Sequence, residues 1–260
     1  MSDDLVLRER RNATLVLTLN RPEKLNALST AMLEELDAAF DKAESDHGVR
    51  VVVVNGAGER AFVAGADIGE YAQLDHDGFV AYQRRSRELF SRIDAFGTPV
   101  VGAINGYAFG GGFEIALCCD VLVASSSAVF ALPEGLLGLC PGGGGTQRLT
   151  RAVGPFVAND MLLSARRLTA HEANALGLVA EVVEPTDLLD AALAKADAIA
   201  KVAPLAARTM AELVRTAGDA DLDRGLDDEQ AALASLRATA DADEGISAFV
   251  DKRAPEFRGS

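Results

Sequence analysis

The segment from Thr98 to Asp120 carries an apolar run into a glycine cluster and then into a short helix-forming stretch with one carboxylate, Glu114. "TPVVGAING" has the continuous apolar character of a strand that is buried on both faces. "FEIALCC" follows three consecutive glycines, Gly110–Gly112. A helix that starts there presents unpaired backbone N–H groups, and glycines let another molecule approach them closely. The segment therefore predicts an α/β protein with a polar site at this helix end.

Other segments alternate between strand and helix patterns in the same way. "LVLRERRNATLVLTLNRP" predicts a β-hairpin with an Arg-Asn turn, and Ser29 is expected to cap the helix that follows. "VRVVVVNGAG" predicts a buried strand, and the next amphipathic helix is expected from Phe79 to Phe96. "DVLVAS" and "AVFALPEG" are strand-like, whereas helices dominate from Thr146 onward. This alternation favours an α/β core over residues 1–200, followed by an acidic helical region over residues 201–260.

Composition and charge exclude several classes of function. The formal net charge of −14 disfavours binding to nucleic acid or to anionic membranes. Residues 95–113 carry no charge, but Pro99 and several glycines interrupt them, which is typical of a soluble interior and not of a membrane span. The start of the chain lacks the organisation of a signal peptide, and three cysteines without CxxC spacing suit a reducing compartment. We therefore expect a cytoplasmic protein with no nucleic-acid or membrane partner.

Common catalytic motifs are also missing from the sequence. The glycines lack the lysine and hydroxyl of a phosphate loop and the spacing of a dinucleotide-binding turn. No Gly-x-Ser-x-Gly elbow is present. The histidines, His47, His76 and His171, lie far apart without metal-ligand spacing, so no metal site is expected.

Two further clusters repeat the pattern of a strand, small residues and a carboxylate. In "ERAFVAGADIGEY" an acidic residue opens a helix after Ala64, Gly65 and Ala66, and "FALPEGLLGLCPGGGGTQRLT" contains Glu134 after a proline. Burial in such apolar surroundings raises the pKa of a carboxyl and suits it to acid–base work near neutral pH. Three interpretations of the glycine-rich helix starts stay open at this point: a phosphate site, an oxyanion hole, or close packing of a helix on a sheet. Either glutamate could also cap a helix or pair with an arginine such as Arg148.

Four motifs together resemble the enoyl-CoA hydratase (crotonase) family: "AFVAGADI", "NGYAFGGGFE", "PEGLLGLCPGGGGTQRL" and "ISAFVDKRAPEF". The resemblance runs from Asn20 to nearly the last residue. It implies a spiral of ββα units with a C-terminal helical region that makes trimer contacts. It also implies an acyl-CoA thioester as substrate and no separate cofactor, because coenzyme A is part of the substrate. The expected assembly is a homohexamer, built as a dimer of trimers, or a homotrimer.

The resemblance assigns roles to individual residues of this chain. Ala66 and Gly111 match the two backbone N–H donors of the family's oxyanion hole, and Glu114 and Glu134 match the catalytic glutamates of true hydratases. The residues expected to bind substrate or coenzyme A are Lys24, Ala64, Ala66, Asp67, Ile68, Gly69, Gly111, Phe249 and Lys252. The candidates for its phosphates are Arg21, Lys24, Lys252, Arg253 and Arg258.

The implied reaction is syn addition of water to a trans-2-enoyl-CoA, which gives a 3-hydroxyacyl-CoA in fatty-acid or aromatic-acid degradation. The alternatives are another reaction of the same fold, namely double-bond isomerisation or thioester hydrolysis, and a non-catalytic acyl-CoA-binding protein. The sequence departs from the family at Gly69, where several hydratases carry lysine. It departs again at Ala131 and Leu132, which are expected to line the region near the acyl chain.

Overall fold

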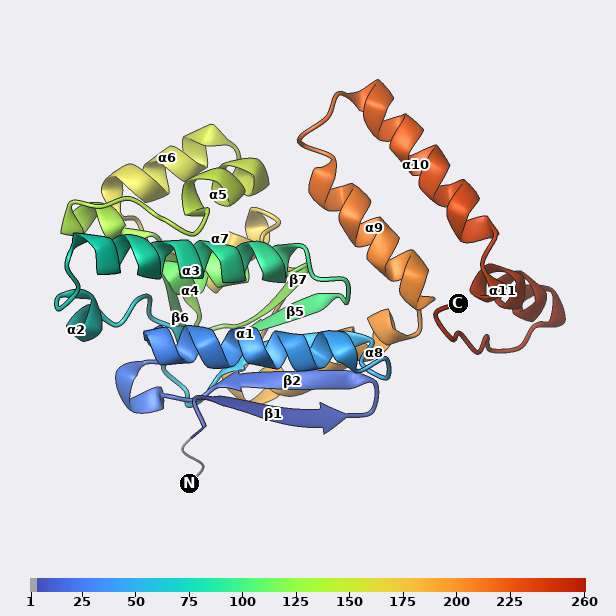
Figure 1. Ribbon diagram of the computed structural model, residues 1–260, viewed down its shortest axis with the longest axis horizontal. Coiled ribbons are helices and arrows are strands. Elements are labelled where there is room, and N and C mark those ends of the chain that lie inside the picture. Colours follow the sequence, from blue (N-terminus) through green and yellow to red (C-terminus); the bar gives the residue numbers. More distant parts are fainter. Residues whose placement is uncertain (1–3) are drawn as a thin grey trace.

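The computed structural model describes residues 4–260 and contains two β-sheets (Figure 1). The larger sheet has the strand order β1-β2-β3-β5-β7-β10, with bounds Val6–Arg11, Thr14–Leu19, Val51–Gly56, Val100–Ile104, Val121–Ser125 and Glu181–Val183. The smaller sheet has the order β4-β6-β8-β9, with bounds Ala61–Val63, Tyr107–Phe109, Val129–Ala131 and Leu168–Thr169. The predicted hairpin is confirmed: β1 and β2 pair antiparallel, with Asn12 in the left-handed conformation at the turn.

A repeated unit connects the two sheets. Each of β3, β5 and β7 lies in the larger sheet, the next strand (β4, β6 or β8) lies in the smaller sheet, and a helix follows. The helices after β4 and β6 are α2 (Ile68–Tyr71) and α4 (Gly111–Ala116), and a 3-10 turn, η2 (Pro133–Leu137), follows β8. The pairs β4·β6 and β6·β8 are parallel, so these three connections leave the same edge of the smaller sheet. The implied spiral of ββα units is thus present, and it gathers the three glycine-rich segments at one edge.

The larger sheet is covered on both faces because its central strands are apolar throughout. Val52 and Val54 pack into the main core, whereas Val51 and Val53 pack into a second core under α8 (Leu188–Ala200). This period of two is the alternation that a pleated strand imposes. The continuous valine run in the sequence therefore predicted the strand correctly.

The helices begin close to where the sequence places them. Ser29 caps α1 (Thr30–Ser45), and its Oγ accepts a hydrogen bond from the Met32 N–H at 3.2 Å. The helix expected from Phe79 is α3 (His76–Asp94), and the prediction was wrong by one turn because Asp75 caps it and accepts from the Gly78 N–H. The remaining helices of the core are α5 (Gly145–Val153), α6 (Pro155–Ser164) and α7 (Ala170–Ala175).

The C-terminal region consists of α9 (Pro204–Thr216), α10 (Leu222–Arg237) and α11 (Ala240–Asp251), which stand beside the core (Figure 1). The tail after α11 returns toward the core, where the Arg50 guanidinium donates to the Phe257 carbonyl. Large apolar side chains are exposed on these helices, including Val214, Leu222, Phe249 and Val250. The boundary at residue 200 and the trimer contacts stay predictions. Within residues 4–260, none of the helices has the length and apolar character needed to cross a bilayer.

Candidate active site

Two helix starts are brought together by close backbone packing at the edge of the smaller sheet. A Cβ at Gly112 would lie 2.1 Å from the Val63 carbonyl oxygen, so only glycine allows this approach. Gly110 has φ 52° and ψ −125°, a conformation that residues with a side chain rarely adopt. A Cβ there would lie 3.7 Å from the Gly65 Cα, which places the Gly65–Ala66 backbone beside the Gly110–Gly111 backbone. Among residues 4–260, neither the Ala66 N–H nor the Gly111 N–H has an acceptor.

Glu114 is buried on α4, one turn into the helix that Gly111 opens. Its Oε1 accepts hydrogen bonds from the Gly143 and Gly145 N–H groups, both at 2.8 Å. Burial raises the pKa of Glu114, and these hydrogen bonds and the Arg148 charge offset part of that rise. The Arg148 guanidinium is itself bound to the Gly143 carbonyl and to Asp94. The alternative in which Arg148 pairs directly with Glu114 is therefore wrong.

Glu134 lies on η2, the 3-10 turn after β8, and lines the same cavity as Glu114. Its Oε1 would be 3.2 Å from a Cβ at Gly110, while its buried Oε2 has no hydrogen-bond partner among the described residues. Burial, with a further contribution from the negative charge of Glu114, raises the pKa of Glu134 to about 7. The fold therefore gathers two carboxyls with raised pKa values beside two free N–H donors, which is suited to proton transfer near an oxyanion.

The cavity that contains these groups has a volume of about 510 Å³. Its walls are largely apolar, with one face of α3 on one side and the exposed leucines of residues 136–139 on the other. Ala64, Ala66, Ile68 and Gly111 all line it. Their contact with substrate stays a prediction. In the described part of the chain, no group of three or more His, Cys, Asp or Glu side chains is arranged to hold a metal ion.

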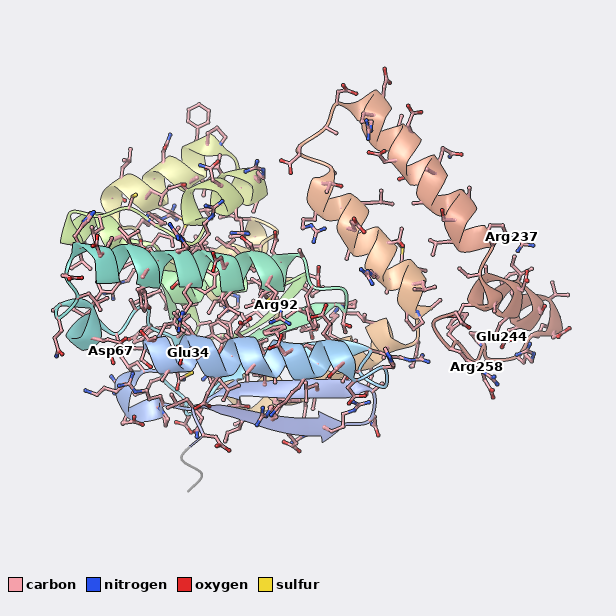
Figure 2. All side chains as sticks on the ribbon, in the orientation of Figure 1. Glu34, Asp67, Arg92, Arg237, Glu244 and Arg258 are labelled. Carbon is pink, nitrogen blue, oxygen red and sulfur yellow. The ribbon has the colours of Figure 1, made fainter. Side chains whose placement is uncertain are left out.

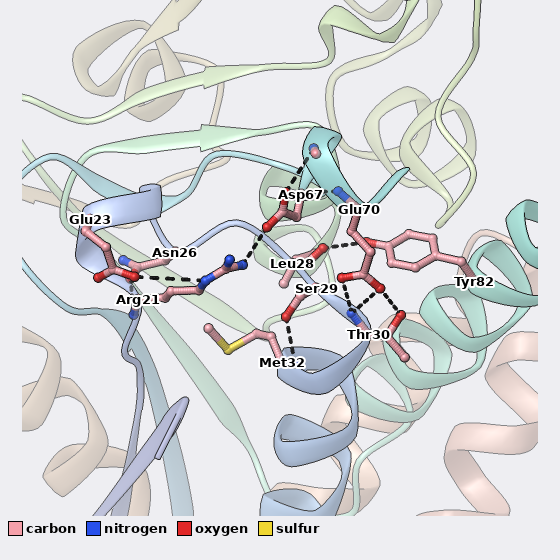
Figure 3. A network of polar contacts seen from close by, with 11 residues as sticks. Arg21, Glu23, Asn26, Leu28, Ser29, Thr30, Met32, Asp67, Glu70 and Tyr82 are labelled. Carbon is pink, nitrogen blue, oxygen red and sulfur yellow. Dashed lines mark hydrogen bonds and ion pairs between the residues drawn. The ribbon is translucent and has the colours of Figure 1, made fainter. Parts of the chain in front are cut away.

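A network of polar contacts fixes the segment that carries Ala66 (Figure 3). Leu28 donates its N–H to the Gly65 carbonyl at 2.8 Å and accepts from the Asp67 N–H at 2.9 Å, so Ala66 is held between two backbone hydrogen bonds. The buried Tyr82 hydroxyl donates to the same Leu28 carbonyl at 2.8 Å. In this parallel bridge Leu28 uses its own N–H and carbonyl, whereas Ala66 is held through the flanking Gly65 carbonyl and Asp67 N–H. The Ala66 N–H therefore makes no hydrogen bond to Leu28.

The same network holds α2 against the start of α1. Glu70 accepts hydrogen bonds from both the N–H and the hydroxyl of Thr30. Asp67 caps α2 by accepting from the Gly69 and Glu70 N–H groups, and it also binds the Arg21 guanidinium at 2.7 Å. These hydrogen bonds lower the pKa of Asp67 even though burial would raise it. Arg21, a candidate for the coenzyme A phosphates, is thus already paired within the protein.

The other candidates for coenzyme A lie in two separate places. Lys24 and Gly69 are exposed near the cavity, whereas Phe249 and Lys252 belong to the exposed end of α11. Figure 2 shows Asp67 at one end of the molecule and Glu244 and Arg258 at the other. A single chain therefore does not bring the two groups together. Arg253 is engaged by Glu244 through hydrogen bonds of 2.6 and 2.8 Å.

One expectation about the acyl region is wrong. Ala131 and Leu132 are fully buried in the core, and neither lines the cavity. The cavity wall is instead made by α3 and by Tyr71 of α2. Gly143 and Gly145, the N–H donors to Glu114, were not among the predicted site residues. Their glycine run was visible, but its partner lies about thirty residues earlier in the chain.

Comparison with known proteins agrees with this architecture. The two sheets and the ββα spiral form the crotonase-type fold seen in enoyl-CoA hydratase structures. The chain belongs to the enoyl-CoA hydratase/isomerase family, whose model matches residues 9–260. The 2,3-dehydroadipyl-CoA hydratase of Escherichia coli is 44% identical over 100% of both chains. The short-chain-enoyl-CoA hydratase of Clostridium acetobutylicum is 39% identical over 95% of both. The crystal structure of an enoyl-CoA hydratase from Bacillus anthracis has a TM-score of 0.96 at 36% identity, with 99% of this chain and 100% of that chain covered.

Proposed function

We propose that this protein is an enoyl-CoA hydratase that adds water to a trans-2-enoyl-CoA and forms a 3-hydroxyacyl-CoA. The observation that carries the proposal is the pair of glutamates with raised pKa values in one cavity with the Ala66 and Gly111 N–H groups. Hydration needs one group to take a proton from water and another to give a proton to carbon. An isomerase or a thioester hydrolase of this family would use the oxyanion donors, but it would not require one carboxyl to take a proton and a second carboxyl to give one.

The chemistry follows from where each group lies. The thioester oxygen binds between the Ala66 and Gly111 N–H groups, which stabilise the negative charge that develops as the double bond is attacked. Glu114, held by two backbone N–H groups, is the base that takes a proton from the water attacking C3. Glu134, whose pKa is about 7, is protonated in a large fraction of molecules at neutral pH and delivers the proton to C2. Both glutamates act on the same face of the substrate, which gives syn addition.

The names of the relatives support an acyl-CoA thioester as the substrate, and coenzyme A enters as part of it with no separate cofactor. Phe249 and Lys252 are proposed to contact the coenzyme A of a neighbouring subunit. The end of α11 that carries them lies at the opposite end of the molecule from α2, which borders the cavity of their own chain. The exposed apolar side chains of α9–α11 support a homotrimer, or a homohexamer built from two trimers. We place the protein in the cytoplasm.

The direct test is an absorbance assay with a panel of 2-enoyl-CoAs, in which loss of the conjugated thioester band is followed together with the product mass. A gain of one water per molecule is the expected result. Disappearance of the band without this gain would identify an isomerase, and release of free coenzyme A would identify a hydrolase. Absence of any reaction, with acyl-CoA still bound, would overturn the proposal in favour of a binding protein.

Replacement of Glu134 is expected to change the pH dependence of stability. Because the folded protein raises the pKa of this carboxyl from 4.5 to about 7, the folded chain binds more protons than the unfolded chain over that interval. The free energy of unfolding therefore falls as pH rises through it. Glu134→Gln removes this loss, so its melting temperature should exceed that of the wild type at about pH 8 and not at about pH 4. Glu229→Gln on the surface of α10 is the control. An equal gain at both pH values would contradict the assignment.

Arg21→Ala separates two roles for this arginine. If Arg21 positions the Ala66 segment through Asp67, kcat should fall by about tenfold with enoyl-CoA and enoyl-pantetheine alike, because misplacement affects the reacting geometry. If Arg21 instead binds a phosphate, KM should rise for the CoA ester alone. Lys24→Ala is the matched control, for which we expect the second pattern. Steady-state kinetics with both thioesters make the measurement.

A further inference from the structure

Gln83 is the polar side chain on α3 that reaches across the acyl part of the cavity. Phe79, Ser86 and Phe90 share its face of the helix and also line the cavity. The Gln83 Nε2 donates to the Tyr71 hydroxyl on α2. Its Oε1 lies so close to the chain beyond η2 that a Cβ at Gly142 would be only 2.3 Å away. Gln83 therefore bridges three segments, α2, α3 and the loop at Gly142.

Tyr71, the anchor of this bridge, is itself fixed in place. Its ring packs edge-on against Phe79 and Tyr82, with centroid distances of 5.1 and 5.3 Å. Burial raises the pKa of Tyr71, and the charges of Glu114 and Glu134 raise it further, which agrees with a hydroxyl that lies near both glutamates and stays protonated. The bridge therefore has a rigid end on the side of the cavity where the reacting carbons would lie.

The position of the bridge relative to the glutamates determines what it can obstruct. Gly142, on which the Gln83 amide rests, immediately precedes Gly143, whose N–H binds Glu114. With the thioester oxygen at Ala66 and Gly111 and the C2–C3 bond at the glutamates, the rest of the acyl chain extends away from the coenzyme. It then runs along the α3 wall and meets Gln83. Leu136 and Leu137 also line the cavity, and both are exposed, so they offer apolar surface to a longer chain.

We propose that Gln83, anchored by Tyr71 and seated against Gly142, closes the acyl end of the cavity and makes the site selective for short-chain 2-enoyl-CoA substrates. The inference rests on the proposed function, since it takes the position of the acyl chain from it. A long alkyl chain would have to displace the amide and break its hydrogen bond to Tyr71, leaving partly buried polar groups without partners. A short chain ends before the bridge and leaves it intact.

The test compares kcat/KM for crotonyl-CoA with kcat/KM for trans-2-decenoyl-CoA. The wild type should prefer crotonyl-CoA, and Gln83→Ala should shift the ratio toward decenoyl-CoA by at least about tenfold, which is within the range that pocket reshaping produces. Gln83→Leu keeps the bulk of the side chain but cannot bond to Tyr71, so it should shift the ratio in the same direction as Gln83→Ala but less. Tyr71→Phe keeps the ring packing and releases the amide, so it should shift the ratio in the same direction as Gln83→Ala but less.

Gln147→Ala, on the exposed side of α5, is the matched control and should keep the wild-type ratio.

A second readout does not depend on turnover. Titration calorimetry with butyryl-CoA and decanoyl-CoA, which are saturated and unreactive, should show the same shift in relative affinity for Gln83→Ala. The selectivity proposal is overturned if the wild type accepts decenoyl-CoA as readily as crotonyl-CoA, or if the ratio in Gln83→Ala equals that of the wild type. If neither substrate is hydrated but the affinities still shift, the proposed function is rejected. The proposal that Gln83 limits the length of the acyl chain would then still hold.

Discussion

Glu114→Gln is expected to lower kcat for crotonyl-CoA by about 10²–10⁴, the usual contribution of a positioned general base. Glutamine has the same shape, so its amide oxygen can keep the hydrogen bonds from the Gly143 and Gly145 N–H groups that now bind Oε1. The other carboxyl oxygen becomes an NH₂ group, which cannot take a proton from water. The protein should therefore fold normally and bind substrate while losing turnover.

Two measurements distinguish this result from a general loss of structure. The Kd for butyryl-CoA should change by no more than about threefold, because the variant loses a proton acceptor and not a group that binds the ester. Glu134→Gln should lower kcat by a similar factor, since its replacement removes the carboxyl whose pKa is about 7. A single variant of either glutamate with wild-type kcat would contradict the division of proton transfer between them.

The sequence could predict those features of the fold and site that depend on neighbouring residues. The valine run of β3, the Ser29 cap and the glycines before α4 each act locally, so pattern and propensity were sufficient to find them. The two glutamates were recognisable because a carboxylate in apolar sequence is costly unless it has a role or a partner. The one-turn error at α3 arose because the Asp75 cap precedes the first apolar residue of the helix.

Features that depend on the tertiary fold could not be predicted in this way. Nothing near Glu114 in the chain indicates that its carboxyl is held by Gly143 and Gly145, since these donors arrive from the segment before α5. The pairing of Arg21 with Asp67 joins residues on different elements, so an arginine that looked free to bind phosphate is already held by a carboxylate of the Ala66 segment. Ala131 and Leu132 were expected near the acyl chain because they depart from the family's residues, whereas the structure buries both in the core and forms the cavity wall from α3.

Gly143→Ala is expected to impair the enzyme through packing alone, without changing any titratable group. A Cβ at this residue would lie 2.3 Å from the Phe90 ring and 2.9 Å from the Glu114 Oε2. Both groups are buried, so neither can move away freely. Such overpacking typically costs about 1–3 kcal/mol of unfolding free energy. The displaced carboxyl would no longer be aligned with the water, and a misplacement of about 1 Å can reduce kcat by about 10².

Gly135→Ala provides the matched control for this prediction. It introduces the same methyl group in η2, directly after Glu134, but the nearest atom to a Cβ there is the Leu162 carbonyl oxygen at 3.7 Å, an ordinary contact. Chemical denaturation and crotonyl-CoA kinetics should therefore show loss of stability and of kcat for Gly143→Ala, with neither loss for Gly135→Ala. Equal effects in both variants would mean that general strain in the loop, and not contact with Phe90 and Glu114, is responsible. Wild-type kcat in Gly143→Ala would show that the position of Glu114 does not depend on the packing around this glycine.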